Sequence, residues 1–150
     1  MNNLALAASP VDELTALAFE DLCLTLQSFN NQLNKPHRDA LRDILNTYSR
    51  FAYGDGLRPG TRFAFPLATA MGKTQSIVSW ALAVHKLYLP FTLLVCQEQI
   101  RDLDELRGDL IAKGVPADKV GLFHRDVIFP HNSGHVVKLP AQTASVFYTR

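Results

Sequence analysis

The sequence predicts an α/β protein in which helices flank a mainly parallel β-sheet, preceded by two N-terminal helices. Apolar residues recur at helical spacing through most of the first 53 positions, and from residue 61 short apolar runs alternate with further helical periods. Strand and helix in alternation are typical of a parallel sheet, because parallel strands need a crossover connection. With 150 residues, 47% of them hydrophobic, the chain is long enough for one core and too short for two full domains.

The first predicted helix begins at Ser9 and Pro10. A serine hydroxyl can cap the helix, proline suits its first turn, and Asp12 and Glu13 favour the positive end of the helix dipole. Residues three and four positions apart form its apolar face: Val11, Leu14, Ala18, Leu22, Leu26 and Phe29. The polar sequence NNQLN ends it.

The second predicted helix begins near Pro36 and stops at the sequence GDG. Its apolar face comprises His37, Leu41, Ile44, Leu45, Tyr48 and Ala52. Residues 54–60, GDGLRPG, follow as a loop, because glycine and proline interrupt regular structure. Both helices are interpreted as packing elements.

The remaining elements alternate. Strands are predicted at 62–68, at 91–96 as a buried strand, at 119–124 and at 145–149, with a weak one at 136–139; helices are predicted at 73–87 and 99–114. Trp80, on the first of these helices, is expected in the core.

Charge and cysteine content narrow the class of protein. Fifteen basic residues nearly balance 14 acidic ones, which excludes a strongly basic nucleic-acid-binding domain. Residues 31–90 nevertheless hold eight basic side chains against three acidic ones. Cys23 and Cys96 lie in apolar surroundings and are expected as buried, reduced thiols of a cytoplasmic protein. No signal peptide or membrane span is predicted.

The sequence LATAMGKTQS, residues 67–76, predicts a phosphate-binding loop. It joins a predicted strand to a predicted helix, where free backbone N–H groups and the helix dipole favour an anion. Gly72 allows close approach of the backbone, Lys73 can reach the outer phosphates, and Thr74 can offer its hydroxyl to Mg²⁺. The alternative interpretation is an ordinary helix start. Leu67 stands where the full Walker pattern has its first glycine.

This loop resembles motif I of superfamily-two (DEAD/DEAH-like) helicases and translocases, in which the first Walker glycine is often missing. Thr69, Gly72, Lys73 and Thr74 match that motif, and Ala70 replaces its usual glycine. If position 70 needs a left-handed backbone, alanine there costs roughly 1–2 kcal/mol.

The resemblance implies an incomplete RecA-like P-loop lobe over residues 34–150, with residues 1–33 as a helical extension. It implies binding of ATP and Mg²⁺ by Thr69, Ala70, Met71, Gly72, Lys73, Thr74 and Gln75, with Lys73 as the catalytic residue and Thr74 as the Mg²⁺ ligand.

Two further segments are similar to parts of that family. TLLVCQEQIRDLDELRGDL is similar to its motif Ia region, which implies nucleic-acid contacts by Gln97 and Gln99; alternatively, these residues only open a helix. NKPHRDALRDIL resembles its adenine-reading segment, which places His37 and Arg38 on the adenine side of the site. Arg38 stands where the family has glutamine, and a guanidinium can donate hydrogen bonds but cannot accept them.

ATP hydrolysis also needs a carboxylate at a strand end to hold Mg²⁺. The family's Asp-Glu pair is missing, because Asp104 and Glu105 lie on a predicted helix. Glu98 and Asp126 are the remaining candidates. No cysteine accompanies the histidines at 124, 131 and 135, and their segment carries Pro130, Asn132 and Gly134, so an exposed loop is expected there and no structural metal.

Three functions follow as hypotheses. The leading one is the ATP-binding part of a nucleic-acid helicase or translocase that lacks a Walker B motif and a second lobe, and this chain alone is expected to show little or no helicase activity. The second is a truncated, non-catalytic interaction module with a protein partner. The third is a single-domain P-loop phosphotransferase using Glu98 or Asp126. Whether the chain is an enzyme is left open by the sequence.

Overall fold

The computed structural model describes residues 8–56, 58, 61–68, 70–97, 99–123 and 144–148. Contacts divide the chain into two compact units, Met1–Leu87 and Tyr88–Arg150. We call them the helical unit and the sheet unit. The boundary expected from the sequence, between residues 33 and 34, falls inside the helical unit.

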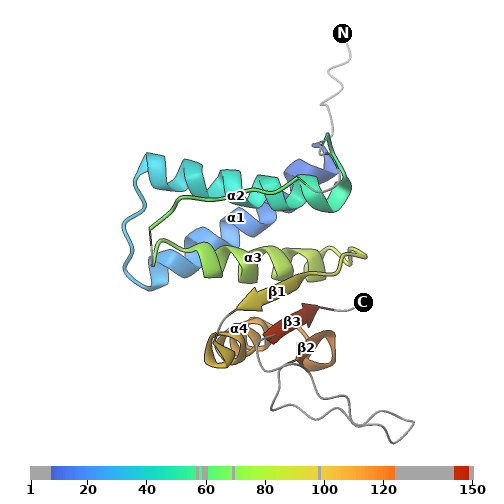
Figure 1. Cartoon of the computed structure of the whole chain (residues 1–150). Helices are drawn as coiled ribbons and strands as arrows, with labels where there is room; N and C mark the ends of the chain where they lie inside the picture. Colours follow the sequence, from blue (N-terminus) through green and yellow to red (C-terminus); the bar gives the residue numbers. More distant parts are fainter. Residues whose placement is uncertain are drawn as a thin grey trace, which may run out of the picture. The chain divides into compact units, whose positions relative to one another are not determined.

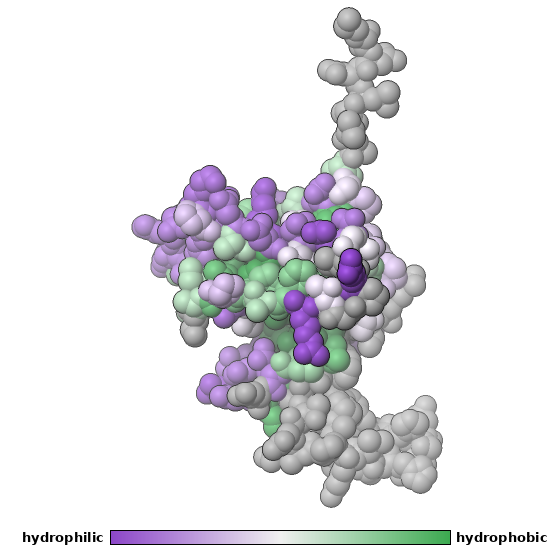
Figure 2. Space-filling view, turned by 45° about the horizontal axis from the view of Figure 1, so that its top comes forward, coloured by the Kyte–Doolittle hydropathy of each residue, from purple (hydrophilic) through white to green (hydrophobic). Residues whose placement is uncertain are grey.

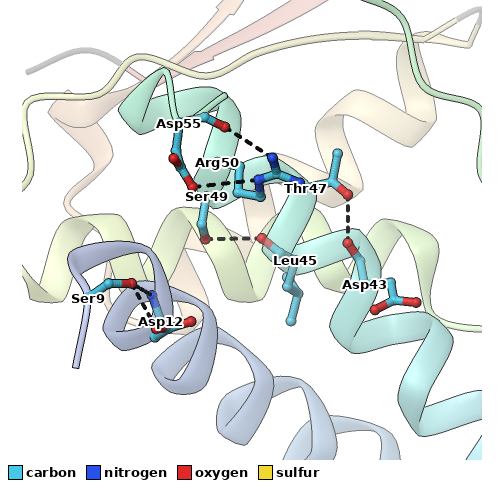
Figure 3. A network of polar contacts seen from close by, with 8 residues as sticks. All are labelled: Ser9, Asp12, Asp43, Leu45, Thr47, Ser49, Arg50 and Asp55. Carbon is cyan, nitrogen blue, oxygen red and sulfur yellow. Dashed lines mark hydrogen bonds and ion pairs between the residues drawn. The ribbon is translucent and has the colours of Figure 1, made fainter. Parts of the chain in front are cut away.

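The helical unit holds α1 (Pro10–Ser28), α2 (Lys35–Tyr53) and α3 (Lys73–Lys86). The predicted start of α1 is confirmed, because the Asp12 amide donates to Ser9 Oγ at 3.1 Å (Figure 3). Asn34 caps α2 in the same way by accepting from the His37 amide, and Gly54 ends α2 in a left-handed conformation. Side-chain capping therefore accounts for the starts of both helices, and a glycine accounts for the end of α2.

The three helices bury a shared apolar core. Its fully or nearly fully buried side chains include Leu14, Leu22, Leu41, Ile44, Leu45, Val78 and Val84. Two polar contacts tie the helices together inside this core: Trp80 Nε1 donates to Ser49 Oγ at 3.2 Å, and Ser79 Oγ donates to Asp21 Oδ2 at 2.7 Å. The expected core position of Trp80 is confirmed, since its side chain is almost completely buried.

The segment 62–68 was predicted to be a strand, and this prediction is wrong, because the segment is irregular. It runs back along α2 toward the start of α3 (Figure 1). Aromatic contacts hold it there: Phe65 meets Tyr48 edge-on at 6.0 Å between ring centroids, and Phe63 meets Phe51 edge-on at 5.2 Å. Two aromatic residues of the apolar run that was predicted as a strand therefore pack on a helix.

The sheet unit holds β1 (Leu94–Gln97), α4 (Ile100–Ala112), a short 3₁₀ helix (Ala117–Lys119), β2 (Val120–Phe123) and β3 (Ala144–Tyr148). Leu103, Leu106 and Leu110 form the buried stripe of α4, which confirms that Asp104 and Glu105 belong to its exposed side. The strands lie in the order β1-β3-β2. Val95 of β1 pairs with Val146, and Leu122 of β2 also pairs with Val146 from the other side.

The predicted mainly parallel, RecA-like sheet is wrong. The described residues are mostly helical, with four α-helices of 13 to 19 residues against three strands of four or five. Both strand pairings found among them are antiparallel. β1 and β2 run in the same direction around α4, as the alternation predicted, but β3 inserts between them in the opposite direction. Local periodicity identifies a strand without fixing its neighbour or its direction.

β1 was predicted to be a buried strand, yet it lies at an edge of this sheet and its residues alternate between exposed and buried. Val95 is buried, whereas Leu94 and Cys96 are exposed. One face of an antiparallel sheet can remain solvated, which accounts for this pattern. The expectation of a buried thiol therefore holds for Cys23 and is wrong for Cys96; neither cysteine forms a disulfide.

Within the described residues, no helix combines the length and apolar character that a membrane crossing requires.

Candidate phosphate-binding site

The loop at residues 70–75 lies at one end of the helical unit. The end of α1, the start of α2 and the start of α3 meet at this end (Figure 1). Two contacts establish the meeting: His37 of α2 bonds the loop at Met71, and Leu26 of α1 lies against Gly72. Three segments far apart in the sequence therefore surround the residues of the predicted phosphate loop.

The backbone of this loop turns sharply before α3. Ala70 and Gly72 have φ values of 64° and 89°, both in the left-handed region. The left-handed backbone considered for position 70 from the sequence is therefore present, with an alanine that adopts it at a cost of roughly 1–2 kcal/mol. Gly72 is the N-cap of α3 and no side chain caps this helix start. Since first-turn amides have no partner within a helix, they are available to an anion.

Gly72 is required for two independent reasons. Its φ of 89° strains any residue that carries a Cβ, and a Cβ at this position would lie 3.0 Å from Leu26 Cδ1 and 3.4 Å from Leu41 Cδ2. The glycine therefore lets the loop pack directly on α1 and α2.

Lys73, the predicted catalytic residue, is exposed at the first position of α3. Its Nζ donates to the carbonyl oxygen of Leu67 at 2.7 Å, so the ammonium group folds back over the loop. Thr74, the predicted Mg²⁺ ligand, is also exposed, and Gln75 is half-buried. The two functional side chains of the predicted motif therefore reach solvent beside the helix start.

His37, one of the two residues expected on the adenine side, bonds to the loop backbone. Its Nε2 lies 3.0 Å from the carbonyl oxygen of Met71. A carbonyl oxygen can only accept, so Nε2 carries the proton and donates. Arg38, the second, is exposed with its guanidinium 5.6 Å from the centre of the Phe19 ring. Both side chains thus have partners within the protein.

A cavity of about 400 Å³ opens beside the loop. One wall is the loop and first turn of α3, and the other is the end of α1. Its lining residues are Leu26, Phe29, Asn31, Ala70, Gly72, Lys73, Thr74 and Gln75. Ligand sites commonly measure about 300–1,000 Å³, so this cavity is within the range for a small polar molecule.

The end of α1 was not predicted to take part in the site. Phe29 and Asn31 line the cavity, whereas His37 and Arg38 do not. The sequence FNN, residues 29–31, did carry a signal for a fixed helix end, because asparagine is one of the few residues that adopts a left-handed cap. Nothing in that signal, however, says which loop the helix end faces.

Burial affects two titratable groups of the helical unit. It raises the pKa of the Tyr48 hydroxyl, while a hydrogen bond with Ser76 acts in the opposite direction. Burial also raises the pKa of the Cys23 thiol, against the opposing effect of the positive charges of Arg38 and Arg42. Cys23 is therefore a neutral packing residue at physiological pH, and it is not an activated nucleophile.

Other predicted site residues lie elsewhere. Gln97 ends β1 and Gln99 precedes α4, both in the sheet unit. The remaining candidates, Thr69, Glu98, Asp126 and the histidines at 124, 131 and 135, fall outside the described residues. In the part of the chain that the structure describes, no group of three His, Cys, Asp or Glu side chains is arranged to hold a metal ion.

No protein-family model, curated protein or solved structure matches this chain. The assignment of a function therefore rests on the loop sequence and on the geometry around it.

Proposed function

We propose that the loop Ala70–Gln75 binds the phosphates of ATP together with Mg²⁺. The observation that carries this proposal is the sharp, glycine-dependent entry into α3, which has no side-chain cap and opens on a cavity of about 400 Å³. A capping side chain would occupy the place of an anion, whereas an uncapped helix start leaves its amides for phosphate oxygens.

Lys73 and Thr74 have separate roles in this proposal. Lys73 exchanges its bond with the Leu67 carbonyl for bonds with the outer phosphates, since a charged phosphate oxygen is a stronger acceptor than a neutral carbonyl. The Thr74 hydroxyl is a ligand for Mg²⁺, which neutralises the charge on the phosphates. Both residues are exposed, so neither has to leave the core to bind.

The wider context of ATP binding comes from the motif resemblance. We propose that the nucleotide serves a helicase or translocase that acts on nucleic acid, with contacts from Gln97 and Gln99. The eight basic residues between positions 31 and 90 give a polyanion a favourable approach. A cytoplasmic location fits two cysteines that form no disulfide, because disulfides are rare in that compartment.

Calorimetric titration of the whole chain with Mg·ATP tests the proposal. We expect saturable binding to the wild type. Lys73→Ala should lower the affinity for Mg·ATP at least tenfold, since a lysine–phosphate bond involves two charged groups. The matched control is Lys86→Ala, because Lys86 is an exposed lysine at the opposite end of the same helix.

Equal affinity for ATP in wild type and Lys73→Ala, or no binding to the wild type, contradicts the proposal. Circular dichroism of both variants checks that the helical unit is intact. Titrations with and without Mg²⁺ separate the role of Thr74 from that of Lys73. Thr74→Val should weaken ATP binding in the presence of Mg²⁺ and leave it unchanged without the metal.

One observation favours the second hypothesis, an interaction module with a protein partner. Hydrophobic surface lies among hydrophilic side chains on the face shown in Figure 2. Phe51 and Phe63 are 42% and 46% exposed and pack on each other. If ATP does not bind, Phe51→Ser and Phe63→Ser become the informative variants, and loss of a partner without loss of helical content supports this function.

A further inference from the structure

The cavity beside the phosphate loop has a second wall that the proposed function leaves unexplained. Phe29 and Asn31, at the end of α1, line this cavity together with Lys73 and Thr74. Phosphate binding needs the loop but has no use for an aromatic ring. The ring therefore calls for an occupant with an apolar, planar part.

The end of α1 is built as a fixed platform. The Asn31 amide donates to the Leu26 carbonyl at 3.1 Å, and the Asn30 amide donates to the Gln27 carbonyl at 2.9 Å. With Asn30 at a φ of 59°, this pair of bonds is a Schellman motif, which terminates a helix in one defined conformation. Phe29 and Asn31 are thereby fixed at the backbone before any ligand arrives.

Leu26 joins the platform to the phosphate loop. Its side chain fills the space beside Gly72, where a Cβ would come within 3.0 Å of it. Leu26 is buried and belongs to α1, so the distance between Phe29 and the loop is set by core packing. The two walls form one preorganised site.

Phe29 is unusually accessible for its type. The residue is 62% exposed, which leaves ring surface available for stacking. Base stacking on an aromatic ring is worth about 1–3 kcal/mol per base, and it uses an exposed ring. Beside it, the side-chain amide of Asn31 can both donate and accept hydrogen bonds, as the edge of a nucleobase requires.

We infer that Phe29 and Asn31 bind the base of the nucleotide whose phosphates the loop holds, with the base stacked on Phe29 and its edge bonded by Asn31. This inference rests on the proposed function. It moves base recognition away from His37 and Arg38, since His37 bonds the Met71 carbonyl and Arg38 lies over Phe19.

The test compares two probes, Mg·ATP and Mg·tripolyphosphate, because the second has phosphates and no base. The variant is Phe29→Leu, which keeps an apolar side chain at an exposed position. Phe51→Leu is the matched control, as Phe51 is an exposed phenylalanine of α2 that does not line the cavity. We expect Phe29→Leu to weaken Mg·ATP about tenfold and to leave Mg·tripolyphosphate unchanged.

A second variant tests the polar contact. Asn31→Ala is expected to weaken Mg·ATP about fivefold, in line with the loss of one hydrogen bond, again without effect on Mg·tripolyphosphate.

Each outcome decides between the two proposals. Unchanged affinity of Phe29→Leu for both probes overturns the inference and leaves the phosphate site standing. An equal loss for both probes also overturns it, because Phe29 would then only support the loop. If the wild type binds neither probe, the proposed function fails, and the base site fails with it.

Discussion

The helical unit and the sheet unit differ in how their elements find partners. Ser9, Asn34 and Gly72 mark the three helix starts of the helical unit, and each acts within its own turn or on an adjacent helix. In the sheet unit, β3 pairs with two strands from much earlier in the sequence. Local signals therefore set the helix starts, including the start of α3 at the candidate site, whereas long-range pairing decided the sheet.

Two glycines give the sharpest test of this comparison. Gly72→Ala in the helical unit is expected to lower the free energy of unfolding by about 2–3 kcal/mol, because it combines a strained φ with a contact against Leu26. Gly108→Ala, within α4 of the sheet unit, is expected to raise it by up to about 1 kcal/mol, because a Cβ there meets nothing within 4 Å. Urea denaturation followed by circular dichroism measures both. Equal effects of the two substitutions would remove the special role of Gly72.

Substitution of His37 is expected to give the next largest effect, a loss of affinity for Mg·ATP. His37→Ala removes the hydrogen bond to the Met71 carbonyl, worth about 1 kcal/mol, and is expected to weaken Mg·ATP about fivefold by loosening the loop. His85→Ala, a half-buried histidine in the last turn of α3, is the control. Affinity unchanged by His37→Ala would mean that α2 does not position the loop.

Substitution of Ala70 is expected to increase stability, whereas Gly72→Ala and His37→Ala decrease stability or affinity. Ala70→Gly relieves the left-handed strain at a φ of 64° and is expected to stabilise the helical unit by about 0.5–1 kcal/mol, less than the strain itself because glycine has a freer unfolded chain. Thermal unfolding with and without Mg·ATP measures the effect. A lower midpoint in Ala70→Gly would show that the alanine side chain contributes more than its backbone strain.

Tyr48 provides the smallest effect, through pH. Burial raises its pKa in the folded protein above the ordinary value of a tyrosine, about 10, so the folded state holds the proton more tightly than the unfolded chain. The contribution of the neutral Tyr48 hydroxyl to the free energy of unfolding is thus fully present below pH about 10. It is lost as the pH rises through the pKa of the folded state. Tyr48→Phe should flatten the alkaline loss of stability measured by urea denaturation between pH 8 and pH 11 (about one unit or more on either side of that value). Parallel curves for the two proteins would contradict this.

Sequence reasoning succeeded where a residue acts on its neighbours. The sequence predicted the cap of α1 at Ser9, the end of α2 at Gly54, and the apolar stripes of α1 and α4. These features could be predicted because they depend on residues within a turn or two. The direction of β3 could not, because nothing within the strand encodes its neighbours. The prediction for 62–68 failed for a related reason: its short apolar run resembles a strand, yet Phe63 and Phe65 pack on α2.

The candidate site divides in the same way. The positions of Gly72, Lys73 and Thr74 at a helix start follow from the motif. The opposite wall does not, since Phe29 and Asn31 become neighbours of the loop only when α1 packs against α3 through Leu26. The sequence raised a left-handed conformation at Ala70 only as a condition, because the resembling family has glycine there, and the structure shows that Ala70 adopts it.

The most direct test of the central claim is the chemical shift of each backbone amide during titration of the ¹⁵N-labelled chain with Mg·ATP. Two groups of amides should shift together, Gly72–Thr74 at the start of α3 and Phe29–Asn31 at the end of α1, while Mg·tripolyphosphate shifts mainly the first group. Shifts in neither group, or shifts confined to residues away from the cavity, would contradict a nucleotide site at this end of the helical unit.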